Sequence, residues 1–112
     1  MASVQWKIQA TGKVATGSLS AIFTAAAYQW VKFLSFYNDH ATLDRTVTVA
    51  VRESGGSTDR KIRRMVIPAG GCEVLTWAGN GIGLQSGDLI KALCAESATD
   101  VDFVISGGTQ VP

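Results

Sequence analysis

The sequence predicts an all-β fold, a single antiparallel β-sandwich of about eight strands that is jelly-roll-like or immunoglobulin-like. Short runs of alternating apolar and polar residues recur along the chain, and turn signals separate them about every 8–12 residues. No amphipathic stretch long enough for a crossover helix lies between these runs, which argues against a parallel sheet. A length of 112 residues fits one domain, so we expect residues 1–112 to form one sandwich with short extended N- and C-terminal ends.

The N-terminal part of the chain predicts three strands. Val4, Trp6 and Ile8 alternate with polar residues, which is typical of a half-buried strand. A second strand is expected over 18–23. The segment 30–37 is largely apolar on both parities, so it predicts a central strand that is covered on both faces.

The middle of the chain predicts a hairpin. Val47, Val49 and Val51 alternate with polar or small residues in the clearest strand pattern of the sequence. The following "SGGSTD" is rich in turn-forming residues, and "RKIRRMVI" over 60–67 forms the returning strand. The next turn is expected at "PAGG".

The C-terminal third predicts three more strands, over 72–77, over "DLIKALCA" from Leu89 onward, and over 101–107, with an extended tail. The pair Asn80-Gly81 favours a tight hairpin turn, and 86–88 favours a second turn. The residues expected in the core are Trp6, Ile8, Val31, Phe33, Val47, Val49, Val51, Val66, Leu75, Leu89, Leu93, Phe103 and Ile105.

Four glycines in the stretch "WAGNGIGLQSGDLIKAL" raise the question of a phosphate-binding loop. Their spacing does not match the dinucleotide-binding or P-loop pattern, and no helix is expected after them. Asp88 follows the last glycine, where a carboxylate would repel a phosphate. We therefore predict turns here and no cofactor.

We predict neither a catalytic nor a metal site, and we do not expect an enzyme. His40 is the only histidine and lies in a polar loop, so an exposed loop role is favoured. Cys72 and Cys94 are not in a C-x-x-C pair and are expected to be small buried hydrophobic residues.

A basic cluster and one tryptophan are the candidate partner contacts: Arg60, Lys61, Arg63, Arg64 and Trp77. The basic residues fit a charge-protected edge strand, a contact with acidic patches of a neighbouring subunit or a nucleic-acid site, and the last is disfavoured because no aromatic residue interrupts them. The net charge of +1 also argues against nucleic-acid or membrane binding. Only 17% of residues are charged, which favours surface that is covered in an assembly.

Five segments in order give the chain a family resemblance: Thr46 to Val51, Ser54 to Ser57, Met65 to Gly71, Leu84 to Ala92 and Val101 to Gly107. This order resembles small β-sandwich virion proteins of tailed bacteriophages. The resemblance implies a structural subunit that is made in the host cytoplasm and resides in the virion. It also implies binding to other virion proteins, such as the major capsid or tail proteins, and a homo-oligomer.

The predicted function is a capsid decoration or cement subunit that binds neighbouring capsid proteins. The alternatives are a tail, neck or baseplate subunit, or a carbohydrate-binding module. A glycan site would need an exposed aromatic platform, and Trp77 beside Asn80 or Tyr37 beside His40 are the candidates.

Overall fold

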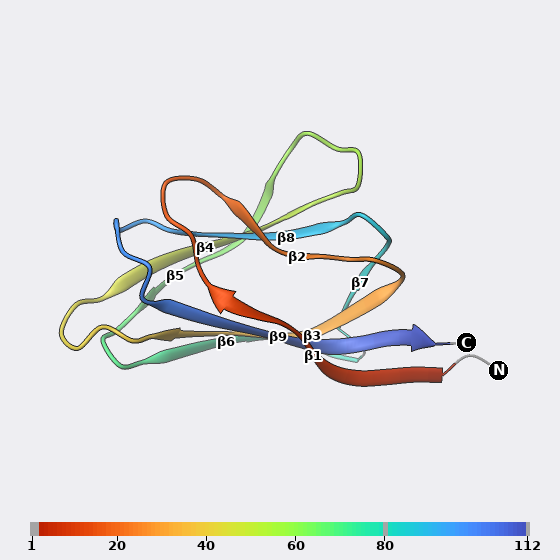
Figure 1. The fold of residues 1–112 in the computed structure, drawn as a ribbon, viewed down its shortest axis with the longest axis horizontal. Helices are drawn as coiled ribbons and strands as arrows, with labels where there is room; N and C mark the ends of the chain where they lie inside the picture. The colour runs from red at the N-terminus through yellow and green to blue at the C-terminus, as the bar shows by residue number, and fades with distance from the viewer. Residues whose placement is uncertain (1–2, 80, 112) are drawn as a thin grey trace.

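A computed structural model describes residues 3–79 and 81–111, and all of their regular structure is β-strand (Figure 1). The fold class is therefore the predicted all-β sandwich. Its strands are β1 (Ser3–Lys13), β2 (Ser20–Thr24), β3 (Gln29–Asn38), β4 (Arg45–Arg52), β5 (Arg60–Ile67), β6 (Cys72–Thr76), β7 (Ile82–Leu84), β8 (Leu89–Cys94) and β9 (Val101–Val111).

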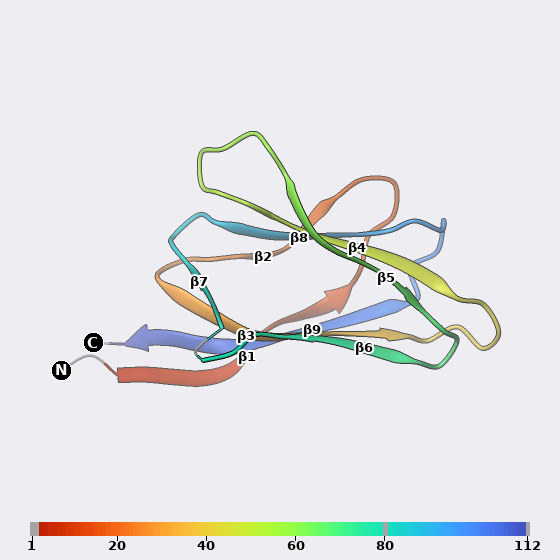
Figure 2. The same cartoon turned by 180° about the vertical axis from the view of Figure 1, so that it is seen from behind.

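The strands form two packed sheets (Figures 1 and 2). Sheet A has the order β1-β9-β3-β6, with the short β7 also on β3, and sheet B has the order β2-β8-β4-β5. The antiparallel pairs β1–β9, β2–β8, β3–β6 and β4–β5 are nested inside one another along the chain. This nesting is the jelly-roll topology, which decides between the two predicted sandwich types.

The two ends of the chain lie side by side within sheet A. The N-terminal half of β1 pairs with the C-terminal half of β9, from Ser3 opposite Val111 to Ile8 opposite Ser106. The predicted extended ends are thus strands, and the tail lies along this chain's own β1. The order of sheet A leaves the other side of β1 as a free edge.

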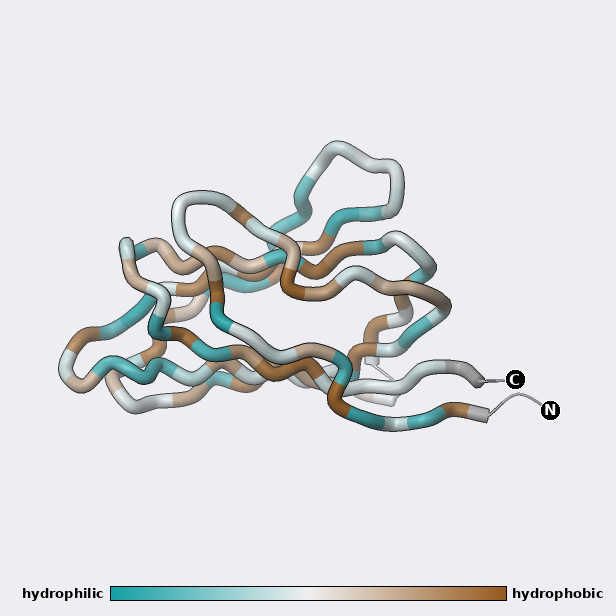
Figure 3. Tube along the Cα trace, in the orientation of Figure 1, coloured by the Kyte–Doolittle hydropathy of each residue, from teal (hydrophilic) through white to brown (hydrophobic). Residues whose placement is uncertain are grey.

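The core lies between the sheets. Leu34, Phe36 and Ile105 of sheet A face Val49 and Ile90 of sheet B, and all five are fully buried. Figure 3 shows apolar and polar residues alternating along many of the strands, whereas the loop between β4 and β5 is pale and teal. The predicted core members that are buried are Val31, Val47, Val49, Leu75, Phe103 and Ile105.

The core prediction is wrong for three residues of sheet B, because their neighbours in the strand face the core instead. Val66 is 54% exposed, and its neighbours Met65 and Ile67 are buried instead. Leu89 and Leu93 are half-buried, because β8 turns Ile90, Ala92 and Cys94 inward. Apolar residues occupy both parities of β5 and β8, so the register with β4 decides which set is buried.

The core predictions for Trp6, Ile8 and Phe33 are also wrong, and β-bulges are the cause. Trp6 is 51% exposed, Ile8 is 64% exposed and Phe33 is half-buried. The register shifts at Gln9 in β1 and at Lys32 in β3, and one extra residue moves the neighbouring side chains to the opposite face. The prediction that the central strand is covered on both faces is wrong, because the fold has two sheets and sheet B covers β3 on one face only.

The predicted burial of two further residues, Val51 and Cys72, also needs correction. Val51 is half-buried and packs against the edge of the core rather than inside it. Cys94 is buried as expected, and burial raises the pKa of its thiol, but Cys72 is exposed at the edge of sheet A. Both cysteines are free thiols.

An ion pair holds one end of the sandwich together. Arg45 is 6% exposed, and its Nε and Nη2 atoms donate to the two carboxylate oxygens of Asp100 at 2.8 and 3.0 Å. This bidentate hydrogen bond lowers the pKa of Asp100 below its ordinary value of 3.8. For Asp59, burial alone would raise the pKa, but hydrogen bonds from Lys91 and Arg52 outweigh that effect and lower it.

These lowered carboxyl pKa values predict acid-sensitive stability. The unfolded chain binds more protons than the folded one near pH 3.8, so the stabilisation is complete well above that pH and is lost as the pH falls through it and below. Asp100→Asn should lower stability at neutral pH and flatten part of this dependence, as measured by urea unfolding between neutral and acidic pH.

The matched control is Asp102→Asn, which breaks the exposed ion pair between Asp102 and Lys13. An exposed pair contributes little to stability. This variant should therefore keep both the neutral-pH stability and the acid transition of the original protein. An unaltered acid transition in Asp100→Asn would contradict the role given to the Arg45–Asp100 pair.

Candidate functional site

The predicted basic cluster lies on the edge strand of sheet B. Arg60, Lys61, Arg63 and Arg64 are all exposed on β5, which has β4 as its one partner in the sheet order. The pairing with β4 shifts register around Ile62, so charge and a bulge both protect this edge from pairing with another chain. Whether a neighbouring subunit also binds these residues stays a prediction.

Trp77 lies beside the basic strand rather than on an open platform. It is half-buried, packs against the core and shares a shallow hollow of about 150 Å³ with Ile62 and Arg63. Its proposed companion Asn80 lies outside the described residues. The fold thus brings Trp77 to Arg63 of the basic cluster, and the Trp77 side chain is half-buried.

In the other predicted glycan platform, Tyr37 and His40 have separate roles. Tyr37 is 40% exposed on the outer face of sheet A. The Nδ1 atom of His40 accepts hydrogen bonds from the backbone N–H groups of Thr42 and Leu43 at 3.0 and 2.9 Å. His40 therefore stabilises the loop before β4, and this half-buried position replaces the exposed one predicted for it.

The glycine-rich stretch forms a turn at 86–88, as predicted. Gly87 has a φ of +92°, and its N–H donates to the carbonyl of Ala25 at 2.7 Å. The Asp88 carboxylate accepts the backbone N–H groups of Gln85 and Ser54 at 2.9 and 2.8 Å. These amides already have partners within the fold, so they do not form an anion-binding cradle. The Asn80-Gly81 prediction falls partly outside the described residues.

The stretch before this turn holds β7, a strand that the sequence interpretation missed. Ile82–Leu84 pairs with Gln29–Val31 of β3. The strand is three residues long and contains Gly83, so it carries almost no strand signal of its own.

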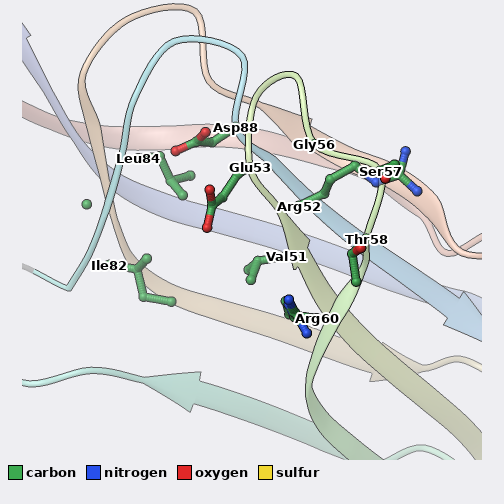
Figure 4. A pocket seen from close by; sticks show the side chains of 11 residues that line it. Val51, Arg52, Glu53, Gly56, Ser57, Thr58, Arg60, Ile82, Leu84 and Asp88 are labelled. Carbon is green, nitrogen blue, oxygen red and sulfur yellow. The ribbon is translucent and has the colours of Figure 1, made fainter.

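A cavity of about 370 Å³ opens between β7 and the loop that joins β4 to β5 (Figure 4). Val51, Ile82 and Leu84 provide its apolar lining, and Glu53 and Arg60 bring charges of opposite sign. Arg52 is held instead by Asp59 at 2.7 Å. Among the residues that the structure describes, no cluster of three or more histidine, cysteine, aspartate or glutamate side chains is placed to hold a metal ion.

The most distinctive surface is the outer face of sheet A, which sheet B does not cover. Side chains of directly paired residues in antiparallel strands project to the same face. Because Leu34 and Ile105 face the core, their neighbours in the sheet must face outward. The large apolar residues that this register places on the outer face, together with the adjoining Tyr28, are Val4, Trp6, Ile8, Tyr28, Trp30, Phe33, Tyr37, Val74 and Val104. We call this set the outer apolar face.

The outer apolar face contains most of the exposed large apolar residues of the described chain. Of the nine such residues, six belong to it, with exposures from 38% for Val4 to 64% for Ile8. The remaining three, Leu43, Ile62 and Val66, lie on other elements. A concentration of this kind on one face is typical of a binding surface.

Glycines allow the aromatic rings of this face to lie close to the sheet. Trp6, Gly108, Trp30 and Gly83 form one row across β1, β9, β3 and β7. A β-carbon on Gly108 would be 3.0 Å from the Trp6 ring, so this ring lies over the glycine. The Trp30 ring meets Tyr28 edge-on with a centroid distance of 4.8 Å. The row is therefore a packed aromatic surface.

Charge is scarce on this face. Among the described strand residues that the register turns outward, the charged ones are Lys13 and Asp102, which neutralise each other through a 2.6 Å ion pair. The described residues form no helix that is long and apolar enough to cross a membrane. Comparison with known proteins gave no match to a family model, a curated sequence or a solved structure.

Proposed function

We propose that this protein is a structural subunit of a larger protein assembly and that it binds neighbouring subunits through the outer apolar face. The observation that supports this proposal is the concentration of exposed apolar side chains on the outer face of sheet A, where Lys13 and Asp102 neutralise each other in an ion pair. The resemblance to tailed-phage virion proteins gives the proposal its specific form, a capsid decoration or cement subunit.

The energetic basis of the proposal is burial of apolar surface. Burying a large apolar side chain contributes roughly 1.5–3 kcal/mol, and aromatic residues such as Trp6 often dominate binding energy. A single contact of this kind is weak after the entropic cost of association. Many copies on one particle multiply weak contacts into stable attachment.

The experiment compares particles from the source phage with and without this gene. Purified protein is added to the deletion particles, and the bound fraction is measured by co-sedimentation. Binding is expected for the original sequence, and Trp6→Ser with Val74→Ser should weaken it at least tenfold, which corresponds to about 1.4 kcal/mol. The matched control is Ile62→Ser with Val66→Ser, which removes two equally exposed apolar residues from sheet B and should retain binding.

The result that would contradict the proposal is the absence of this chain from particles made with the gene intact. Equal binding by the two double variants would exclude the outer apolar face in particular. In that case the basic strand β5 with Trp77 becomes the candidate contact.

The row formed by Trp6, Trp30 and Tyr28 keeps carbohydrate binding as a second candidate, because aromatic faces also bind sugar rings. A glycan panel discriminates the two functions. Binding of a defined glycan that Trp6→Ala abolishes, with the fold unchanged, would favour a carbohydrate-binding module. If Trp77→Ala abolished it instead, the half-buried Trp77 would be the site.

A further inference from the structure

We infer that two copies of this chain pair through the free edges of β1, antiparallel and about a twofold axis at Trp6, so that their two A sheets become one. The inference goes beyond the proposed function, because it concerns the edge of sheet A, whereas the proposed function concerns its outer face. It rests on three observations: the state of each sheet edge, the register that β1 allows and the charges in that register.

The edges of the two sheets differ in how they are protected. β5 carries four basic residues, and β2 has five residues and a register shift between Ala21 and Phe23. The far edge of sheet A is divided between the short strands β6 and β7. β1 has eleven residues, and its run from Ser3 to Ile8 pairs with β9 without a bulge. This run is the edge best suited to pairing with another strand.

The β1 edge is complementary to itself in one register. A twofold axis perpendicular to the sheet at Trp6 places Val4 opposite Ile8 of the second copy and Gln5 opposite Lys7. Apolar residues then meet apolar residues on the outer face, and each lysine meets an amide. Shifting the axis to Lys7 would place two lysines opposite each other, which is unfavourable.

The exposed fractions of these side chains fit such a pairing. Val4, Trp6 and Ile8 are 38%, 51% and 64% exposed, although each of them lies in the part of β1 that pairs with β9 without a bulge. Pairing two copies would cover part of each of them. It would also join the aromatic rows of both copies into one, so that the outer apolar faces of the two copies form one continuous surface.

The test uses disulfide cross-linking of the full chain in a Cys72→Ser background, because Cys72 is an exposed free thiol. On the twofold axis, the two Cα atoms of residue 6 would lie about 4.5–5.5 Å apart, within the range of a disulfide. Trp6→Cys should therefore give a covalent dimer under mild oxidation. Ile8→Cys is the matched control, because the two Cα atoms of residue 8 would lie about 13 Å apart along the strands, so this variant should give no covalent dimer.

Charge variants test the register by sedimentation. Val4→Lys with Ile8→Lys places like charges opposite each other and should give monomers. Val4→Glu with Ile8→Lys places opposite charges together and should retain the dimer. Tyr37→Lys with Val74→Lys changes the outer apolar face away from β1 and should also retain it, while weakening attachment to particles.

Three outcomes would overturn the inference: a monomeric original protein at every concentration tested, cross-linking of Ile8→Cys as efficient as that of Trp6→Cys, or a dimer that survives the paired lysines. If particle binding persisted in any of these cases, the pairing would be rejected and the proposed function would stand. If the dimer formed but particles never bound the protein, the proposed function would fail alone.

Discussion

Val49→Asp is expected to prevent folding. Val49 is fully buried in the middle of β4, where it faces the core between the paired strands β5 and β8. A carboxylate at this position would be buried without a partner, and the penalty approaches the whole stability of a domain, about 5–15 kcal/mol. Circular dichroism should show the loss of the β spectrum, and the purified protein should lack a cooperative thermal transition.

The matched control is Val66→Asp on the neighbouring strand. Val66 has the same side chain but is 54% exposed, although its sequence pattern places it in the predicted core. Its stability should change by no more than about 0.5 kcal/mol. A folded Val49→Asp, or an unfolded Val66→Asp, would contradict the assignment of the two faces of sheet B.

Gly107→Ala should be the most damaging single-methyl change in sheet A. A β-carbon at this position would overlap the backbone carbonyl of Trp30 and would lie 2.9 Å from the Cα of Val31. These are backbone atoms of the adjacent strand β3, so the strands must separate. We expect a loss of about 3 kcal/mol or more in the free energy of unfolding, measured by urea denaturation.

Gly83→Ala is the control for this change. It lies in the same sheet, but its added β-carbon would meet only the hydroxyl end of the Tyr28 side chain, at 2.8 Å. That side chain is 45% exposed and can move aside, so the loss should be about 1 kcal/mol or less. Equal losses in the two variants would show that the close approach at Gly107 is not the cause.

The strand pattern was predictable because turn-forming residues separate almost every strand from the next. Alternation identified β4, and the glycine-rich loop before β5 identified a hairpin. The topology was not predictable, since the nesting of pairs depends on contacts between residues such as Trp6 and Gly108 that are about a hundred positions apart. The short β7 is stabilised by β3 rather than by its own sequence.

The outer apolar face was not recognised from the sequence because its residues look like core residues. Trp6 and Ile8 share the parity of Ala10, which does pack against the core, and the bulge at Gln9 separates the two groups. A bulge of this kind has no clear local signal. The adjacent glycines Gly107 and Gly108 are the one hint, because glycines inside a strand often mark close approach of other groups.

The candidate contacts that sequence reasoning did select lie elsewhere. Arg63 and Trp77 share the shallow hollow between β5 and β6, whereas Arg60 lines the cavity beside β7. The structure does not test whether any of them binds a partner. Sequence reasoning found this cluster because charge is visible as a run of residues. The outer apolar face becomes visible only when the register of its strands is known.

The most direct test of the proposed docking is electron cryomicroscopy of purified particles that carry this protein. The expected map places the outer apolar face against a neighbouring subunit, with Trp6 and Val74 in contact and the loop between β4 and β5 exposed. A map in which the outer apolar face is open to solvent, while β5 makes the contact with the particle, would contradict the account.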